Sequence, residues 1–204
     1  MNAGGTMLRV YEGIRRRVVT GGFAPGERLE PARLAEDLHA SVTPVRDALH
    51  RLTGERLIES WQQEGFRQIL ITEGVLRDLY RWSADLLALA LKQPGEGTAD
   101  LAPLEAAAPY PDRLAALFAH IACRHDNHEI RIAVENLNAR LYRARIVEAE
   151  IWDDCDLEIA ALFDHLVDPS ALRRQVSRMH RRRLHQAGRI AARLRPHDDR
   201  RERH

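Results

Sequence analysis

The residues of this sequence best suited to specific chemistry lie between positions 41 and 50. Helical spacing places Thr43, Arg46, Asp47 and His50 on one face of a helix. Short polar side chains and an arginine near a helix N-terminus suit a helix that enters the major groove of DNA end-on. The pattern therefore predicts hydrogen bonds and ionic contacts to bases and phosphates, with Arg46 as the strongest candidate.

The start and the opposite face of this helix are also readable. Ser41 is a natural N-cap, because its hydroxyl can accept a hydrogen bond from a free backbone N–H of the first turn. Pro44 falls in that first turn, where its missing N–H costs nothing. An apolar stripe at helical spacing points inward: Val45, Ala48, Leu49 and Leu52. An ordinary capped surface helix would show the same pattern, so the neighbouring elements must decide between the two interpretations.

Those neighbours predict a winged helix-turn-helix within residues 1–72. Apolar residues at helical spacing predict a helix over residues 8–19, which ends at Gly21-Gly22. Pro31 opens a second helix, and the 41–52 helix follows after a short connection. Two strand-like runs, 57–61 and 66–71, are joined by a polar tip at 62–65 and predict a hairpin.

Composition and cysteine usage limit the class of protein. The chain has 204 residues, of which 45% are hydrophobic and 5% aromatic, with a net charge of +1. These values favour helices packed through leucine and alanine, and they do not by themselves indicate a nucleic-acid binder. Cys123 and Cys155 lack a CxxC partner and are expected as thiols in a reducing cytosol. No signal peptide or apolar run of membrane-spanning length is visible, so we expect a soluble cytoplasmic protein.

No arrangement of residues suggests catalysis. The serines lack a His/Asp arrangement at a useful spacing, and the glycine pairs have the composition of turns without a phosphate-loop lysine. We therefore expect neither an enzyme nor a bound cofactor.

Several ordered motifs in the first 72 residues resemble the DNA-binding domain of the GntR family of bacterial transcription regulators. The matching blocks are Tyr11-Glu12-Gly13-Ile14-Arg15, Pro25-Gly26-Glu27-Arg28-Leu29, Leu34-Ala35-Glu36-Asp37-Leu38 and Thr43 to Leu52, with Leu57-Ile58 and Gly65-Phe66 in the wing. The resemblance implies a homodimeric regulator, a repressor by expectation, that reads a palindromic operator in double-stranded DNA. Arg46, assisted by Ser41, Thr43 and His50, would contact bases or phosphates. Arg33 and Arg51 would position the DNA backbone, and Gly65 would let the wing approach the minor groove.

Three departures from the family pattern affect these expectations. Val42 stands where the family usually has arginine, and Arg56 stands where it usually has glycine. A left-handed backbone at Arg56 would carry a strain of about 1 kcal/mol or more. The wing tip, often basic in the family, is Gln62-Gln63-Glu64 here. Weaker or differently specified DNA binding is predicted, and a partner-binding or scaffold protein that has lost specific DNA reading is the alternative.

The rest of the chain predicts an all-helical bundle over residues 73–195, followed by a charged tail at 196–204, so the fold class is mainly α. Helices are expected over 72–92, 112–124, 127–149, 152–167 and 168–194, with Thr72 and Asp168 as caps and at most one short helix within 94–111. We expect this domain to sense a small molecule or to serve for dimerisation alone.

This half resembles, less specifically, the FCD-like sensing domain of FadR-type GntR regulators, through Leu76-Arg77-Asp78-Leu79-Tyr80, Asn127 and Asp168-Pro169. In many such domains one Asp and three His hold a divalent metal. The resemblance places those ligands at Leu114, Phe118, Leu157 and Met179, and a common arginine at Ser83, so we expect no metal site. The space is either a filled core or a pocket for an apolar effector, lined by these five residues and Trp82.

Two further groups of side chains leave alternatives open. His120, His125 and His128, with His180 one position from the expected ligand, are either ordinary histidines or a residual metal site. The last helix carries a run of arginines, including Arg173, Arg174, Arg178 and Arg181 to Arg183. They form either a solvated face paired with acids, which we favour, or a second phosphate contact. Trp61 and Trp152 are expected to be packing residues.

Overall fold

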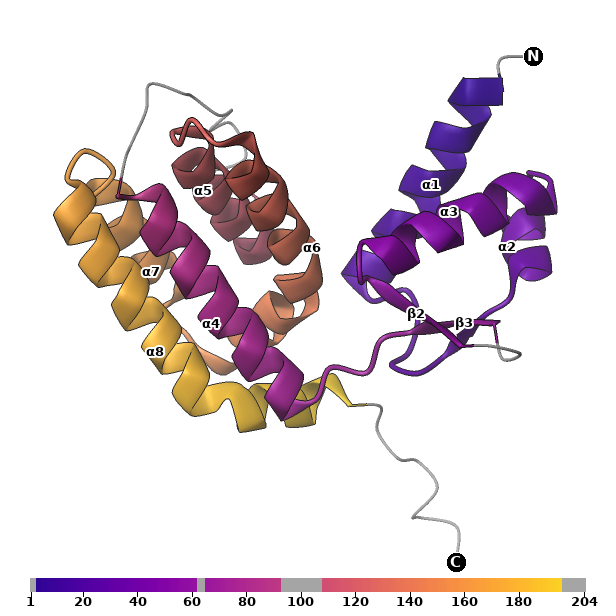
Figure 1. The fold of residues 1–204 in the computed structure, drawn as a ribbon. Helices are drawn as coiled ribbons and strands as arrows, with labels where there is room; N and C mark the ends of the chain where they lie inside the picture. Colours follow the sequence, from indigo (N-terminus) through magenta and orange to yellow (C-terminus); the bar gives the residue numbers. More distant parts are fainter. Residues whose placement is uncertain (1–2, 62–64, 93–107, 196–204) are drawn as a thin grey trace, which may run out of the picture. The chain divides into compact units, whose positions relative to one another are not determined.

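The structure is a computed structural model that describes residues 3–61, 65–92 and 108–195 (Figure 1). The chain divides into two compact units, and the division falls between Ile71 and Thr72. The wing tip at 62–64, the loop at 94–97 and the 196–204 tail lie outside the described residues. None of the described helices has both the length and the apolar composition needed to cross a membrane.

The first unit is a winged helix-turn-helix built from three helices and a small sheet. Its helices are α1 (Ala3–Thr20), α2 (Pro31–Asp37) and α3 (Val42–Gly54). Its strands are β1 (Arg28–Leu29), β2 (Ile58–Trp61) and β3 (Gly65–Gln68), antiparallel in the order β1-β3-β2. The core is formed by side chains of α1 and α3 that are almost completely buried, among them Val10, Ile14, Val45, Leu49 and Leu52. The predicted hairpin is present, but β3 ends at Gln68 rather than residue 71.

Strand β1 is an element that the sequence analysis did not predict. Leu29 pairs with Phe66 and Arg28 with Arg67, so a two-residue segment completes the sheet beside β3. Two backbone hydrogen bonds extend this pairing, from the Gly26 amide to the Gln68 carbonyl and from the Gln68 amide to the Glu27 carbonyl. A strand of two residues is too short to show a periodicity in the sequence. Its hydrogen bonds come from β3, which is distant along the chain, so nearby residues do not reveal β1 either.

The second unit contains five described helices and is all-α over the described residues. They are α4 (Glu73–Ala90), α5 (Tyr110–Cys123), α6 (His128–Ile151), α7 (Cys155–Asp164) and α8 (Pro169–Leu194). Helix α4 packs along α8, and α5 packs along α6 (Figure 1). The mainly helical fold class predicted from the sequence is confirmed.

The helix boundaries depend on their caps. The Thr72 hydroxyl accepts from the Val75 amide, and the Asn127 side chain accepts from the Glu129 amide. A carboxylate oxygen of Asp168 accepts from the amides of Ser170 and Ala171, as its sequence position predicted. Two expectations were wrong in detail: α5 begins at Tyr110, ahead of Asp112, because proline is tolerated in a first helical turn, and α7 is shorter than predicted at both ends.

Candidate nucleic-acid interface

Helix α3 begins where the sequence analysis placed it, but its cap differs. Ser41 is the N-cap, with an extended backbone (φ −76°, ψ 161°), yet its side chain makes no capping hydrogen bond. The predicted hydroxyl contact to the first turn is therefore wrong. The turn before it is closed by backbone bonds from the amides of Leu38, His39 and Ala40 to carbonyls of α2, with His39 in the left-handed region (φ 48°). The Ser41 hydroxyl remains exposed at the helix N-terminus.

The two faces of α3 separate completely. Four apolar side chains are at most 1% exposed and lock the helix into the unit: Val45, Ala48, Leu49 and Leu52. Thr43, Arg46 and His50 are all exposed on the other face, together with Ser41. This separation brings four of the predicted DNA-contact residues onto one surface of one helix.

Arg46 has the properties of a ligand-contacting arginine. It is exposed in the N-terminal half of α3 and makes no hydrogen bond or ion pair to the residues that the structure describes. The free amides at a helix N-terminus add a partial positive charge to the same end. Arg33 on α2 is exposed as well. Both guanidinium groups can therefore meet phosphate or base acceptors.

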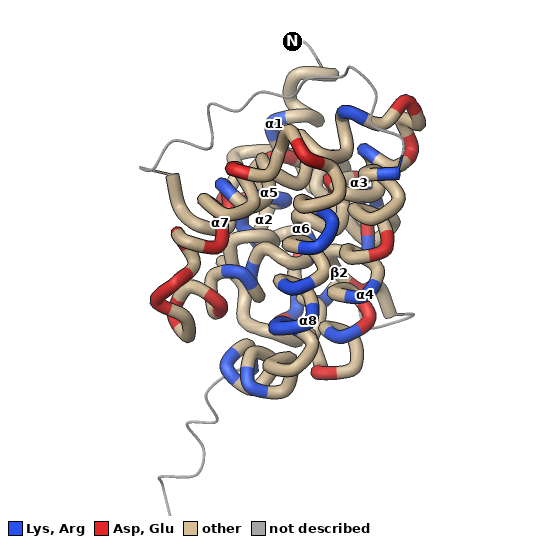
Figure 2. Tube along the Cα trace, turned by 90° about the vertical axis from the view of Figure 1, so that its left-hand side faces the viewer, with Lys and Arg blue, Asp and Glu red and all other residues tan. Residues whose placement is uncertain are grey.

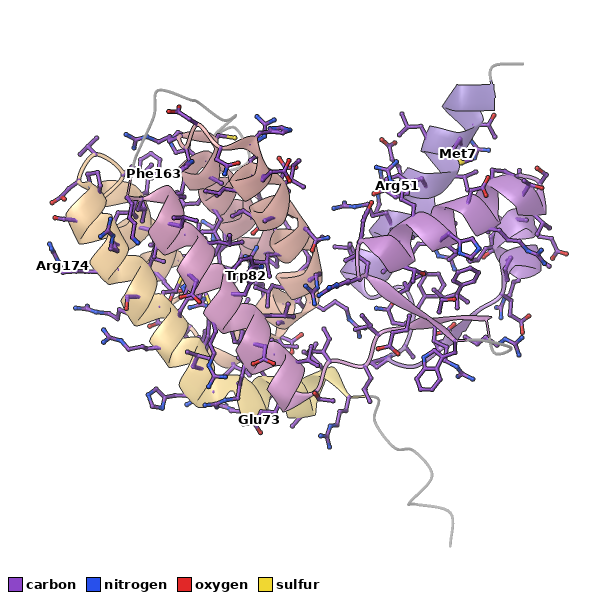
Figure 3. All side chains as sticks on the ribbon, in the orientation of Figure 1. Met7, Arg51, Glu73, Trp82, Phe163 and Arg174 are labelled. Carbon is purple, nitrogen blue, oxygen red and sulfur yellow. The ribbon has the colours of Figure 1, made fainter. Side chains whose placement is uncertain are left out.

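Arg51 is held by contacts within the first unit (Figure 3). Its guanidinium carbon lies 3.8 Å from the centroid of the Tyr11 ring, and its Nε donates to Glu55 at 3.1 Å. The Tyr11 hydroxyl donates to the same carboxylate at 2.7 Å. Partial burial, followed by the hydrogen bond to Glu55 and the charge of that carboxylate, raises the pKa of Tyr11. Arg51 thus links α3 to α1, a structural role that the sequence analysis did not assign to it.

The wing adds two residues with left-handed backbones. Gly65 has φ 80° at the start of β3, and Arg56 has φ 56° at the predicted strained position before β2. The His50 ring packs edge-on against Phe66 of β3, with 5.0 Å between ring centroids, and so connects α3 with the sheet. Trp61 is 56% exposed, so its expected packing role is wrong, whereas Trp152 is buried as expected.

The residues expected to line a pocket in the second unit divide into two groups. Ser83, Leu114, Phe118 and Met179 are buried. Trp82 is 50% exposed and Leu157 is 73% exposed, so placing them inside the domain was wrong (Figure 3). The physical reason is helical phase: α4 buries Tyr80 and Ser83 on either side of Trp82, and α7 buries Glu158 beside Leu157.

His180 occupies the interior between the buried residues. Its Nδ1 lies 2.8 Å from the Val176 carbonyl, its Nε2 lies 3.0 Å from the Ser83 hydroxyl, and its ring stacks near Phe118. Burial lowers the pKa of His180 to about 3, so the ring is neutral at ordinary pH. Both ring nitrogens therefore have protein partners.

A buried ionic cluster, here called the Arg183 cluster, was missed by the sequence analysis. Arg183 donates to Glu148 at 3.0 Å and to Glu158 at 3.0 and 2.6 Å, and it also contacts the Tyr110 hydroxyl. The Tyr80 hydroxyl donates to Glu148 at 2.5 Å. Burial alone would lower the pKa of Arg183, but Glu148, Tyr110 and Glu158 raise it well above its usual value. The solvated position expected for Arg183 is therefore wrong.

A signal for this cluster was present in the sequence. Val176, Met179, Arg183, Ala187 and Ile190 follow helical spacing, so Arg183 lies in the apolar stripe of α8. A second arginine, Arg145, is buried in α6 and donates to Asn138 at 2.9 Å, with its guanidinium carbon 5.1 Å from the Phe118 ring centroid. The position of Arg183 inside an apolar stripe indicates a buried ion pair, because an unpaired buried charge is very costly. Arg145 does not follow this rule: its buried Nη1 has no hydrogen-bond partner.

The remaining histidines and cysteines lie apart from one another or are engaged by the protein. Among the described residues, no three His, Cys, Asp or Glu side chains are grouped so that they could hold a metal ion. His125 accepts from the Asn127 amide, and His128 lies beside Arg131. Cys123 and Cys155 are free thiols, and burial raises the pKa of Cys155 to about 11.

The fold and the α3 surface define the class: a winged helix-turn-helix protein with a helical second domain. Residues 6–67 match the family model described as "Bacterial regulatory proteins, gntR family". The chain is 30% identical over 95 residues to the HTH-type transcriptional repressor GlaR of Escherichia coli. The aligned residues make up 45% of this chain and 43% of GlaR. It is 39% identical over 70 residues to the Nta operon transcriptional regulator of Aminobacter aminovorans, covering 34% of this chain and 33% of that protein.

Solved structures show the same fold over most of the chain. E. coli McbR/YncC has a TM-score of 0.66 at 21% identity and covers 90% of this chain and 97% of its own. A putative GntR transcriptional regulator from Rhodococcus sp. RHA1 has a TM-score of 0.70 at 17% identity, covering 89% and 96%. The chain spans less than half the length of the curated relatives it matches, and the family model matches only its first unit.

Proposed function

We propose that this protein is a transcriptional regulator, a repressor by its similarity to GlaR, which binds a palindromic DNA operator as a homodimer. The main support for this proposal is the surface of α3. Arg46 is exposed there among small polar side chains, while the apolar side chains of the opposite face are buried. In a helix-turn-helix dimer, two such helices enter successive major grooves about one DNA turn apart.

The exposed residues of this surface would have different roles on DNA. Arg46 contacts a base edge or a phosphate, assisted by Ser41, Thr43 and His50. Arg33 and Arg51 contribute positive charge that positions the DNA backbone. Arg51 does so while its guanidinium is stacked on the Tyr11 ring. Gly65 lets the wing backbone approach the minor groove.

The helical unit would serve dimerisation and control, as in the FadR-type branch of the family. A filled interior is the arrangement favoured for this chain, because Leu114, Phe118 and Met179 are at most 2% exposed and His180 and Ser83 satisfy each other. An effector would act by binding one arrangement of the dimer better than another.

Arg46 provides the direct test. Operator sequences selected from a random DNA pool would be used for fluorescence anisotropy with the full chain. Arg46→Ala should weaken specific binding by about 1–3 kcal/mol, or roughly 5- to 150-fold. Arg16→Ala, which removes an exposed arginine of α1, is the matched control and should retain affinity. If Arg46→Ala bound the operator with the same affinity as the wild type, the proposal that α3 reads DNA through Arg46 would be contradicted.

The scaffold alternative rests on Val42, which is 37% exposed at the first position of α3, where the family usually has arginine. Salt dependence separates the two functions. A DNA reader loses affinity steeply as salt rises, because phosphate contacts release counterions. If no DNA sequence were selected from the pool, and any remaining binding to DNA were insensitive to salt, the function as a scaffold protein would be favoured.

A further inference from the structure

A groove of about 890 Å³ runs between α4 and α8. Its floor includes small or apolar side chains from both helices: Ala84, Ala88, Val176 and Leu184. The two alanines lie one turn apart on α4, and their short side chains leave room above the line where the helices pack. The result is a hollow with an apolar base, of a size typical of sites for small molecules.

The rim of this groove is strongly basic. Five exposed arginines line it, namely Arg81, Arg173, Arg174, Arg178 and Arg181, against one exposed carboxylate, Asp85. Five positive charges and one negative charge give a net charge of +4. Basic residues recur along α8 in the charge-coloured trace (Figure 2), and Arg174 stands at the outer side of that helix (Figure 3).

These arginines are only lightly engaged by the protein itself. Arg173 donates to the Leu91 carbonyl at 3.1 Å, and Arg174 lies 3.5 Å from the Ser170 hydroxyl. Arg81 pairs with Asp78 at 3.4 Å, but both side chains are more than half exposed, so that pair is weak and exchangeable. Within the described part of the chain, Arg178 and Arg181 have no hydrogen-bond or ion-pair partner. The rim therefore carries uncompensated charge.

The net charge argues against a second copy of the chain as the occupant. A two-fold interface places the same patch on both subunits, so self-pairing would bring two strongly basic surfaces together. The concave apolar floor also argues against a DNA backbone, which is convex and presents polar phosphates and sugars to a protein.

We propose that the α4–α8 groove binds a small organic compound that carries two or more phosphate groups on an apolar or planar body. Each phosphate group of such a compound adds negative charge, so two of them offset most of the net positive charge of the rim. Arginine is the side chain best suited to phosphate oxygens, because its planar fork donates two parallel hydrogen bonds. The alanine and valine floor receives the body of the ligand.

The position of the groove gives such a ligand a route to regulation. It would contact α4 and α8 together, and α4 begins at Glu73, directly after the first unit ends at Ile71. His180 lies at the groove base and is hydrogen-bonded to Ser83 of α4, so the two helices are already joined beneath the site. This regulatory part rests on the proposed DNA-binding function, whereas the binding site itself does not.

Calorimetric titration of the full chain at low salt, with ADP and inorganic pyrophosphate as probes, tests the site. ADP should bind one per chain and more tightly than pyrophosphate, which lacks the planar body. The double variant Arg178→Ala/Arg181→Ala should lose at least tenfold in ADP affinity. Arg189→Ala, an exposed arginine of α8 outside the groove, is the matched control and should bind as wild type does.

Three outcomes would overturn the proposal. They are no ADP binding at millimolar concentration, a double variant with wild-type affinity, and displacement of ADP by random-sequence duplex DNA. Sedimentation of the double variant checks the second-copy alternative, because a change in assembly with unchanged ADP affinity would assign the groove to subunit contact. Arg46→Ala should leave ADP affinity intact, so a failure of the DNA-binding proposal is distinguishable from a failure of this one.

Discussion

Arginine shows how position decides the role of one side chain in this protein. Lys92 is the only lysine, so almost every cation has the same chemistry. Arg46 is exposed and available, Arg51 is stacked on Tyr11, and Arg183 is buried among carboxylates. The energetic consequence of replacing an arginine therefore ranges from DNA affinity alone to the stability of a whole domain.

Arg56 gives a prediction about backbone strain. Its φ of 56° lies in the left-handed region, which glycine adopts without cost. Arg56→Gly should therefore stabilise the first unit by about 0.5–1 kcal/mol, after the greater unfolded-state entropy of glycine is subtracted. Urea unfolding would measure the change.

The control for this prediction is Glu36→Gly, in helix α2. Glu36 is exposed and helical, so glycine there should destabilise by up to about 1 kcal/mol. If Arg56→Gly lowered stability to the same extent, strain at Arg56 would be disproved.

His180 gives a prediction about pH. Burial lowers the pKa of His180 from the 6.5 of an ordinary histidine to about 3; Arg183 and Arg145 lower it further, and the hydrogen bond with the Val176 carbonyl raises it. Below pH 6.5 His180 becomes protonated in the unfolded chain, whereas in the folded chain it stays neutral down to about pH 3. The stability contribution of neutral His180 is thus complete above pH 6.5 and is lost as pH falls, at up to about 1.4 kcal/mol per pH unit.

Comparing variants isolates this effect from other titrating groups. His180→Gln should show a shallower loss of stability than wild type between pH 6.5 and 4, measured by urea unfolding. His185→Gln, which replaces an exposed histidine of the same helix, should retain the wild-type slope. Identical slopes for His180→Gln and wild type would contradict a neutral buried ring.

Sequence reasoning succeeded for residues whose surroundings are local. Ser41, Thr43 and Arg46 could be placed on an outer helical face, because helical phase depends only on nearby residues. It failed for Trp82 and Leu157, which were placed by alignment to a distant pattern rather than by the phase of their own helices. Whether the exposed residues touch DNA stays a prediction.

At the scale of elements, side-chain caps define several helix starts, and their strengths differ. Asn127 accepts from the Glu129 amide at 3.0 Å, whereas Ser41 makes no capping bond to α3. Asn127→Ala should therefore cost about 1 kcal/mol of stability, and Ser41→Ala less than about 0.5 kcal/mol. Thermal unfolding would compare the two variants, with Asn127→Ser as a version that can still cap.

A large loss for Ser41→Ala would mean that its hydroxyl does cap α3. If stability is retained but operator affinity falls, Ser41 acts on DNA rather than on the fold. The same pair of measurements thus separates a structural serine from a binding serine.

Elements with strong periodicity were predictable, and those defined by distant contacts were not. Helices α4, α6 and α8 began within a residue of their expected positions, because Thr72, Asn127 and Asp168 are recognisable caps. Strand β1 escaped detection because its hydrogen bonds are supplied by β3, almost forty residues later.

At the scale of the whole molecule, the Arg183 cluster joins all five described helices of the second unit. Tyr80 comes from α4, Tyr110 from α5, Glu148 from α6, Glu158 from α7 and Arg183 from α8. The first unit has its own core, so the two units should respond separately to changes in this cluster.

Arg183→Leu provides the test of the cluster at this scale. It would leave the carboxylates of Glu148 and Glu158 buried without their cation, which should cost about 3–5 kcal/mol. Replacing all three with leucine should recover most of that loss, because a buried ion pair and a well-packed apolar group differ little in stability. Hydrogen exchange resolved by peptide should show the loss in α4 to α8 only, with protection of α1 and α3 unchanged. Equal loss of protection in both units, or a triple variant no more stable than Arg183→Leu, would contradict this account of how the domain is held together.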